Sequence, residues 1–292
     1  MSLSNFKAEI RARFEKIEGI PALPETARRI LELRAKGDPN IAALAKLIEL
    51  DPSLSAQVIR YARSTLYGYR GKIDSVEASI SRVLGYDVVL NIALGLATSK
   101  PFKIQRHGRL GADEYWMRAV RSAILSQALC HSMPSHKELS ASFAYLAGLL
   151  HEFGMLTLGH MYPKEYAKLN LLISRQPELD LLQLEREAFG ITHTEAGARI
   201  LRFWDLPEEI VVCSLKYSDP TFSGIQQDYV YLVQLANQLC DFDEDDPNPI
   251  IERVSPSLMI KLELNAAAIV KVAEQTIPSF VDMNSMIRKL AA

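Results

Sequence analysis

The chain has 292 residues, 48% of them hydrophobic and 23% charged, with a formal net charge of −2 at pH 7. This length can bury a large core and accommodates two domains. The nearly balanced charge provides no general electrostatic attraction to nucleic acid or to a membrane. The sequence shows no basic, apolar leader and no uncharged run of about 20 residues. We therefore expect a soluble, cytoplasmic protein without a membrane partner.

Helical spacing of apolar residues dominates the first hundred residues, and alternating strand-like patterns are nearly absent. The expected helices begin at residues that suit a cap or a first turn, namely Pro24, Asn40, Asp51 with Pro52, and Asp74. Asp74 forms a capping-box pattern with Glu77. We expect the first of these helices to end at Gly37 and the fourth at Gly85, followed by a helix over about 87–99.

The second half shows the same periodicity. Helices are expected over residues 113–131, 139–150, 152–160, 163–174, 179–189, 193–203, 207–217, 227–241 and 265–275. The polar, glycine-containing segment 101–111 is the best candidate for a domain boundary. The sequence therefore predicts an all-α protein, with an N-terminal helical bundle over residues 1–105 and a second helical domain over 106–292.

The three cysteines, Cys130, Cys213 and Cys240, lie far apart in the sequence. None forms a C-x-x-C pair, and an odd number does not indicate a disulfide framework. Because free cysteines are commonly buried, we predict three reduced, buried thiols.

The most informative segment is Gly-Leu-Leu-His-Glu-Phe-Gly at residues 148–154. The imidazole of His151 and the carboxylate of Glu152 are both suitable metal ligands. Neighbouring residues on a helix point about 100° apart, so both reach one ion only where the helix ends or bends. Alone, the pair favours a capping or core-edge role over a metal site.

Two further motifs follow. Residues 191–197 place Thr192 or His193 at the start of a helix, in which Gly197 permits close packing. The Trp-Asp-Leu-Pro segment at residues 204–207 indicates a helix stop, a short turn and a helix begun by proline. Each motif, taken alone, has a structural interpretation.

Together the motifs have the order and spacing of a known family. The sequence resembles the HDOD family, the HD-related output domain, which is itself similar to HD-type metal phosphohydrolases. Residues 21–24, 48–55 and the helix end at Ile80 with Leu84-Gly85 resemble further segments of that family. The resemblance covers residues 15–240 and implies that residues 106–292 form an HD-like helical domain with a C-terminal extension.

The resemblance implies where a metal site would lie. Catalytic HD proteins use an initial His, a His-Asp pair, further His residues and a late Asp. This chain keeps His151 and His193 and carries Glu152 in place of the paired Asp, and a glutamate can still ligate. The other ligand positions have changed, to Arg118 for the initial His, Tyr217 and Ser218 for a later His pair, and Asn237 for the late Asp.

These changes predict a degenerate HD pocket with no catalytic residue, no metal and no other cofactor. A guanidinium repels a divalent ion, and an amide supplies no charge. Arg118 would instead pair with Glu152 and fill the former metal position. The alternative is a reduced mononuclear site in which His151, Glu152 and His193 hold iron, manganese or zinc with water ligands, the arrangement that activates water for hydrolysis.

Other candidate sites are weaker. The spacing of four aspartates resembles that of a calcium-binding loop, at Asp241, Asp243, Asp245 and Asp246. The central glycine and the final glutamate of such a loop are missing, which favours a solvated acidic loop. No ligand role is assigned to the isolated histidines His107, His131, His136 and His160. A solvated helix face is expected for the N-terminal basic residues Arg11, Arg13, Lys16, Arg28 and Arg29.

The resemblance implies a stand-alone bacterial signalling module that acts by binding a signalling protein partner or, alternatively, a nucleotide. This expectation rests on family likeness, because a fold alone does not set a function. The competing hypothesis is a metal-dependent phosphohydrolase or phosphodiesterase with the reduced site. A third hypothesis, nucleic-acid binding through the basic N-terminal helices, is disfavoured by the acidic overall balance.

Overall fold

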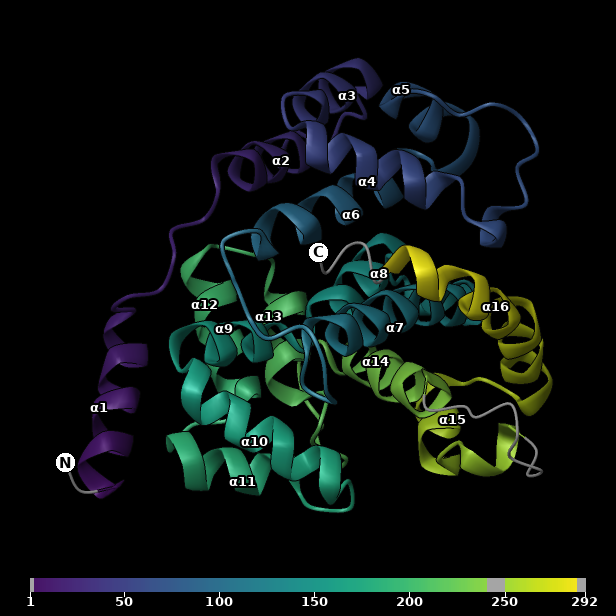
Figure 1. Ribbon diagram of the computed structural model, residues 1–292. Coiled ribbons are helices and arrows are strands. Elements are labelled where there is room, and N and C mark those ends of the chain that lie inside the picture. Colours follow the sequence, from purple (N-terminus) through teal and green to yellow (C-terminus); the bar gives the residue numbers. More distant parts are fainter. Residues whose placement is uncertain (1–2, 241–249, 288–292) are drawn as a thin grey trace.

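The computed structural model describes residues 3–240 and 250–287, and every regular element in these ranges is helical (Figure 1). The prediction of an all-α fold is confirmed. The first half contains α1 (Leu3–Lys16), α2 (Glu25–Ala35), α3 (Ile41–Glu49), α4 (Pro52–Ala62), the 3₁₀ turn η1 (Thr65–Tyr67), α5 (Val76–Ser79), the π-helical turn η2 (Ile80–Leu84) and α6 (Tyr86–Ser99). The second half contains α7 (Ala112–Ser132), η3 (Ser135–Lys137), α8 (Ala141–Leu150), α9 (Phe153–Met161), α10 (Pro163–Arg175), α11 (Leu181–Phe189), α12 (His193–Phe203), α13 (Glu208–Lys216), α14 (Gln227–Cys240), η4 (Ile250–Arg253), α15 (Pro256–Leu262) and α16 (Ala266–Ile287).

Side-chain caps explain several helix starts. Asn40 and Asp51 cap α3 and α4, because their side-chain oxygens accept hydrogen bonds from backbone N–H groups in the first turn. The cap predicted at Asp74 is wrong by one residue. Ser75 is the extended residue before α5, and its hydroxyl oxygen accepts from the Ala78 N–H at 3.0 Å.

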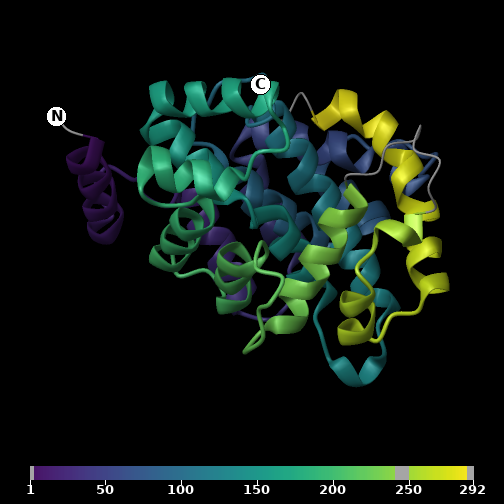
Figure 2. The ribbon, with the colours of Figure 1, turned by 90° about the horizontal axis from the view of Figure 1, so that it is seen from below.

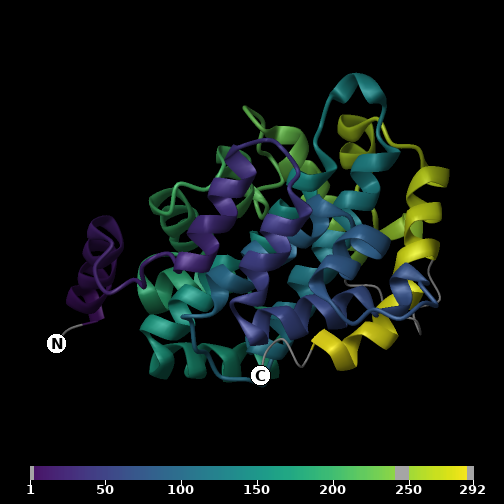
Figure 3. The ribbon, with the colours of Figure 1, turned by 90° about the horizontal axis from the view of Figure 1, so that it is seen from above.

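The helices α2 to α6 form a layer over the second half of the chain (Figure 1; Figure 3). Helix α6 lies at the junction, since it packs on α2, α3 and α4 and also on α8. Helix α1 departs from this layer and lies beside α11 and α12 (Figure 2), where Ile10 and Phe14 are buried. The division at residue 105 stays a prediction, and α1 packs across it.

The centre of the second half is built from α7, α8 and α14, which pack on one another. Within the described ranges, the run Ala141–Met161 is long and apolar enough to cross a membrane by length and composition, but 83% of its apolar 18-residue window is buried inside the fold. Its apolar character is therefore explained by its place in the core. Cys130, Cys213 and Cys240 are reduced and buried, as predicted.

The last helix is longer than the sequence pattern indicated. The predicted end at residue 275 is wrong, because α16 continues through Pro278 to Ile287. It packs on α7 and on η1, and so contacts both halves of the chain. Arg121 of α7 anchors it by donating to the Asn284 side-chain oxygen at 2.8 Å and by lying over the Phe280 ring.

Candidate functional site

A cluster of buried and half-buried polar side chains forms where α8 gives way to α9. His151 and Glu152 are the only residues between these helices, and both side chains are buried. The interruption of the helix lets the two neighbours face one cluster, which a continuous helix would not permit. Helices α7, α11, α12 and α14 and the end of α13 supply the remaining members.

The predicted ion pair between Arg118 and Glu152 is present. Arg118 Nε donates to Glu152 Oε2 at 2.8 Å, and the two side chains are 28% and 9% exposed. The guanidinium also donates to the Arg109 carbonyl at 3.0 Å and to the Met155 sulfur at 3.3 Å. Burial raises the pKa of Glu152, but the Arg118 guanidinium together with the His151 and His193 rings outweighs burial and brings the pKa below the ordinary value. The pair is therefore ionised at neutral pH.

Both ring nitrogens of His151 are engaged. Nδ1 lies 2.7 Å from the Gly148 carbonyl oxygen, which can only accept, so Nδ1 carries the proton and donates. Nε2 is then free to accept from the Asn237 side-chain amide at 3.1 Å. Burial lowers the pKa of His151, in keeping with a neutral ring. The Ser214 hydroxyl donates to the His151 carbonyl at 3.1 Å and holds the turn against α13.

His193 is held by a carboxylate that the sequence analysis did not single out. Glu185 of α11 is fully buried, and its oxygens lie 2.7 and 2.8 Å from His193 Nδ1. The same carboxylate accepts from the His193 backbone N–H at 2.9 Å. Burial lowers the pKa of His193, but the charge and hydrogen bond of Glu185, together with the charge of Glu152, outweigh burial and raise the pKa above the ordinary value. His193 Nε2 contacts the Tyr217 hydroxyl at 2.5 Å.

A signal for Glu185 was present in the sequence. Glu185 lies four residues before Phe189, and both residues are buried on one face of α11. A carboxylate on an apolar helix face needs a partner, and a histidine follows at the start of the next helix. This pattern would have indicated an acid and histidine pair.

Six of the seven predicted pocket residues take part in this cluster through the hydrogen bonds and ion pair described above. Tyr217 also packs edge-on against the ring of His151, with centroids 4.6 Å apart. Ser218 does not join them. It is exposed in the turn after α13, and Ser214, one turn earlier on the buried face, contacts His151 instead.

The arrangement does not fit a metal centre. Among residues 3–240 and 250–287, no group of three or more His, Cys, Asp or Glu side chains is placed to hold a metal ion. The fallback ligands His151, Glu152 and His193 each direct their candidate atom at a protein partner, respectively Asn237, Arg118 and Tyr217. The aspartate-rich segment at residues 241–246 lies outside the described residues.

Arg118→Ala is expected to lower the free energy of unfolding by about 2 kcal/mol, less than for a fully buried pair because Arg118 is partly exposed. The loss arises because Glu152 stays buried without its cation. Urea unfolding measures the effect, and Arg118→Met with Glu152→Gln should recover most of it. Arg13→Ala, which breaks the exposed Arg13–Glu9 pair, is the matched control. An Arg118→Ala protein as stable as this control would contradict a stabilising ion pair.

Residues 20–220 match the family model of the HDOD domain. The chain belongs to the HDOD family. A crystal structure of an HDOD domain protein from Geobacter sulfurreducens superimposes with a TM-score of 0.73 at 20% identity and covers 99% of both chains. This likeness confirms the all-α HDOD fold.

Further relatives carry names from two functional classes. A candidate signal transduction protein of Marinobacter aquaeolei VT8 is 27% identical, with a TM-score of 0.79 over 98% of this chain and 66% of its own. A candidate phosphohydrolase of Shewanella amazonensis SB2B is 17% identical, with a TM-score of 0.75 over 96% and 98% of the two chains. A protein of Treponema pallidum (strain Nichols) is 21% identical over 91% of this chain. This HDOD chain spans 50% of the Treponema protein's length.

Proposed function

We propose that this HDOD chain is a non-catalytic signalling module that acts by binding a protein partner, and that its HD pocket has become a structural element. The observation that carries the proposal is the Arg118–Glu152 ion pair, with its 2.8 Å contact inside the pocket. A guanidinium in this place supplies the positive charge that a metal ion would otherwise bring to the carboxylate. The resemblance to a candidate signal transduction protein at 27% identity supports the regulatory role.

The hydrogen bonds around the pair support the same conclusion. A hydrolytic metal centre needs several free ligand atoms and an open coordination position for water. Here the Nε2 atoms of His151 and His193 both face hydrogen-bond partners, and the paired carboxylate faces a cation. Opening the site would require breaking three buried or half-buried contacts before an ion could bind. The closed network favours a scaffold over a phosphohydrolase.

Metal content and turnover test the proposal together. The purified protein is loaded separately with Mn²⁺, Fe²⁺ and Zn²⁺, desalted, and analysed for metal, and bis(p-nitrophenyl) phosphate serves as the substrate. We expect less than about 0.1 ion per chain and no turnover, because no open ligand set is available. A reconstructed variant, Arg118→His with Tyr217→His and Asn237→Asp, restores ligand types and should retain more metal than the wild type.

The opposite result is equally clear. One tightly held ion per wild-type chain, lost in His151→Ala together with phosphodiester cleavage, would show that the HDOD chain is a phosphohydrolase.

The binding role is tested by affinity capture from cells that make the protein. A protein recovered in stoichiometric amount should form a complex with the purified chain in size-exclusion chromatography.

A further inference from the structure

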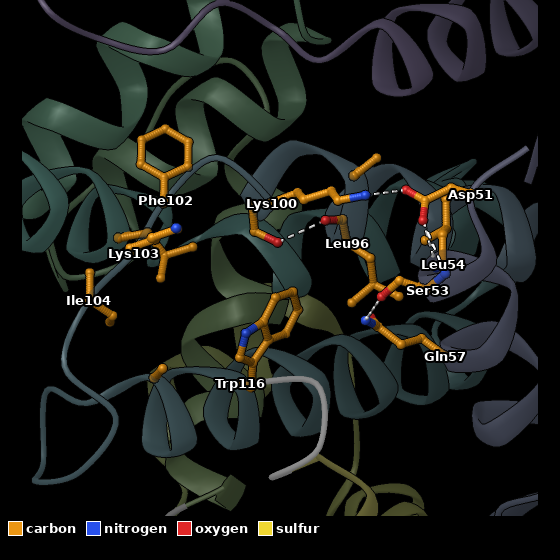
Figure 4. A pocket seen from close by; sticks show the side chains of 14 residues that line it. Asp51, Ser53, Leu54, Gln57, Leu96, Lys100, Phe102, Lys103, Ile104 and Trp116 are labelled. Atoms are coloured by element: carbon orange, nitrogen blue, oxygen red, sulfur yellow. Dashed lines mark hydrogen bonds and ion pairs between the residues drawn. The ribbon is translucent and has the colours of Figure 1, made fainter. Parts of the chain in front are cut away.

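A cavity of about 470 Å³ lies between the two halves of the chain, away from the polar cluster (Figure 4). Its walls come from α4 and α6 on one side, and from α7, α9 and the segment after α6 on the other. Small-molecule sites commonly have this volume and occur between packed layers of a fold.

The cavity is positively charged although the whole chain is acidic. Its lining contains two lysines, Lys100 and Lys103, and one acid, Asp51, so its formal charge is 2 − 1 = +1. Asp51 is already neutralised, since it accepts from Lys100 Nζ at 2.5 Å and caps α4. Among the ion pairs of the described residues, none involves the Lys103 ammonium. Lys103 is exposed, and in Figure 4 its ammonium lies below Phe102 on the side that faces Lys100.

Aromatic and polar groups complete the lining. Trp116 of α7 and Phe102 are 7% and 8% exposed and form apolar walls. Ser53 and Gln57 lie on α4 across the cavity from Lys103 (Figure 4). Gln57 Nε2 donates to Ser53 Oγ at 3.3 Å, which leaves the Gln57 carbonyl oxygen as an acceptor. The cavity thus offers a cation, an aromatic surface and a hydrogen-bonding edge.

The cavity is distinct from the HD pocket. Trp116 and Arg118 are two residues apart on α7, so their side chains point about 200° apart and reach opposite faces of the helix. The two sites are nevertheless connected through α9. Leu156 lines the cavity, and its neighbour Met155 accepts from Arg118.

We propose that this cavity binds a small organic anion that carries an aromatic ring, of about the size of a mononucleotide. The anionic group contacts Lys103, because Lys100 already pairs with Asp51, and the ring packs on Trp116, where stacking is favourable. A polar edge of the ring faces Ser53 and Gln57. The inference does not rest on the proposed regulatory role, because it uses none of the residues of the polar cluster.

Tryptophan fluorescence provides the test. The chain has two tryptophans, so a Trp204→Phe background leaves Trp116 as the reporter. Adenosine monophosphate is titrated, with adenosine and 4-hydroxybenzoate as further probes. We expect a saturable change with adenosine monophosphate at about 0.1 mM and binding at least about five-fold weaker for adenosine, because one charge contact is lost. Saturable binding of 4-hydroxybenzoate instead would identify the anion as a carboxylate.

Two variants decide the role of the cation. Lys103→Gln should weaken binding of the anion by about five-fold, the effect of one partly exposed charge. Lys72→Gln, at a lysine in the loop before α5 that is 83% exposed, should leave binding unchanged. No saturable change up to about 5 mM with any anion, equal binding of adenosine, or equal weakening by both variants would overturn the proposal. Metal content and phosphodiester cleavage do not enter these readouts, so failure here is separable from failure of the proposed function.

Discussion

Replacing Glu185 by alanine should lower the free energy of unfolding by about 3–5 kcal/mol, as expected when one partner of a buried ion pair is removed. Glu185 is fully buried and makes three contacts of 2.7 to 2.9 Å with the ring and backbone of His193. The variant leaves a buried imidazole and a backbone N–H without their acceptor. Urea unfolding followed by circular dichroism measures the loss.

Glu187→Ala is the matched control, because Glu187 lies on the exposed side of the same helix and only accepts from Gln183. It should cost about 0.5 kcal/mol or less. If Glu185→Ala and Glu187→Ala were equally stable, the interaction between Glu185 and His193 would not contribute to folding.

The same pair should make stability depend on pH. Glu185 raises the pKa of His193 in the folded protein above the ordinary 6.5, so its contribution is complete below pH 6.5 and declines as pH rises through the folded value. His151 behaves in the opposite way. Its pKa is lowered, so its contribution is present above the ordinary value and is lost as pH falls. Glu185→Gln should remove the pH dependence of stability that comes from His193 and leave the one that comes from His151. Unfolding compared between about pH 5 and pH 9 measures both.

Gly154→Ala is expected to cost about 3–5 kcal/mol or to prevent folding. A methyl group at Gly154 would lie 1.8 Å from the His193 carbonyl oxygen and 2.6 Å from the Gly197 nitrogen. Both are backbone atoms of α12, so relief requires the helices α9 and α12 to separate. That separation would also move His193 away from Glu185. Urea unfolding measures the loss, and soluble yield is the readout if the variant does not fold.

Gly95→Ala provides the comparison. Gly95 is a buried glycine of α6, and an added methyl would meet the Leu149 side chain at 2.4 Å rather than a backbone atom. Leucine can change its rotamer, so we expect a loss of about 1 kcal/mol. Equal stability of the two variants would show that the α9–α12 contact is looser than the structure indicates.

The sequence anticipated features that depend on neighbours along the chain. Helical spacing and cap residues placed most helix boundaries within two residues of those observed. The Asp74 cap was off by one because Ser75 provides an equally good oxygen one position later. The end of α16 was missed, since the expected range stopped at residue 275. Packing on α7 and η1 keeps the helix continuous past Pro278.

The candidate site was anticipated only in part. Family spacing placed Arg118 and Glu152 together, and the structure has them in contact. Glu185 was missed because its helical spacing to Phe189 was not used as a sign of burial, and its partner His193 lies in another helix. Ser218 was included because it adjoins Tyr217 in the chain, yet the end of α13 turns it to solvent.

By itself, the sequence determined the all-α class and the positions of most helices, because periodicity and caps are local properties. The changed HD ligand positions stay a prediction from the family resemblance. The tertiary structure decided what those residues do. It placed the candidate ligand atoms of His151, Glu152 and His193 in contact with protein partners. It also placed the Glu185 carboxylate within hydrogen-bond distance of His193. It also opened a charged cavity between α4, α6 and α7. Each of these depends on side chains from different helices meeting in space, and that meeting is set by how the apolar faces pack.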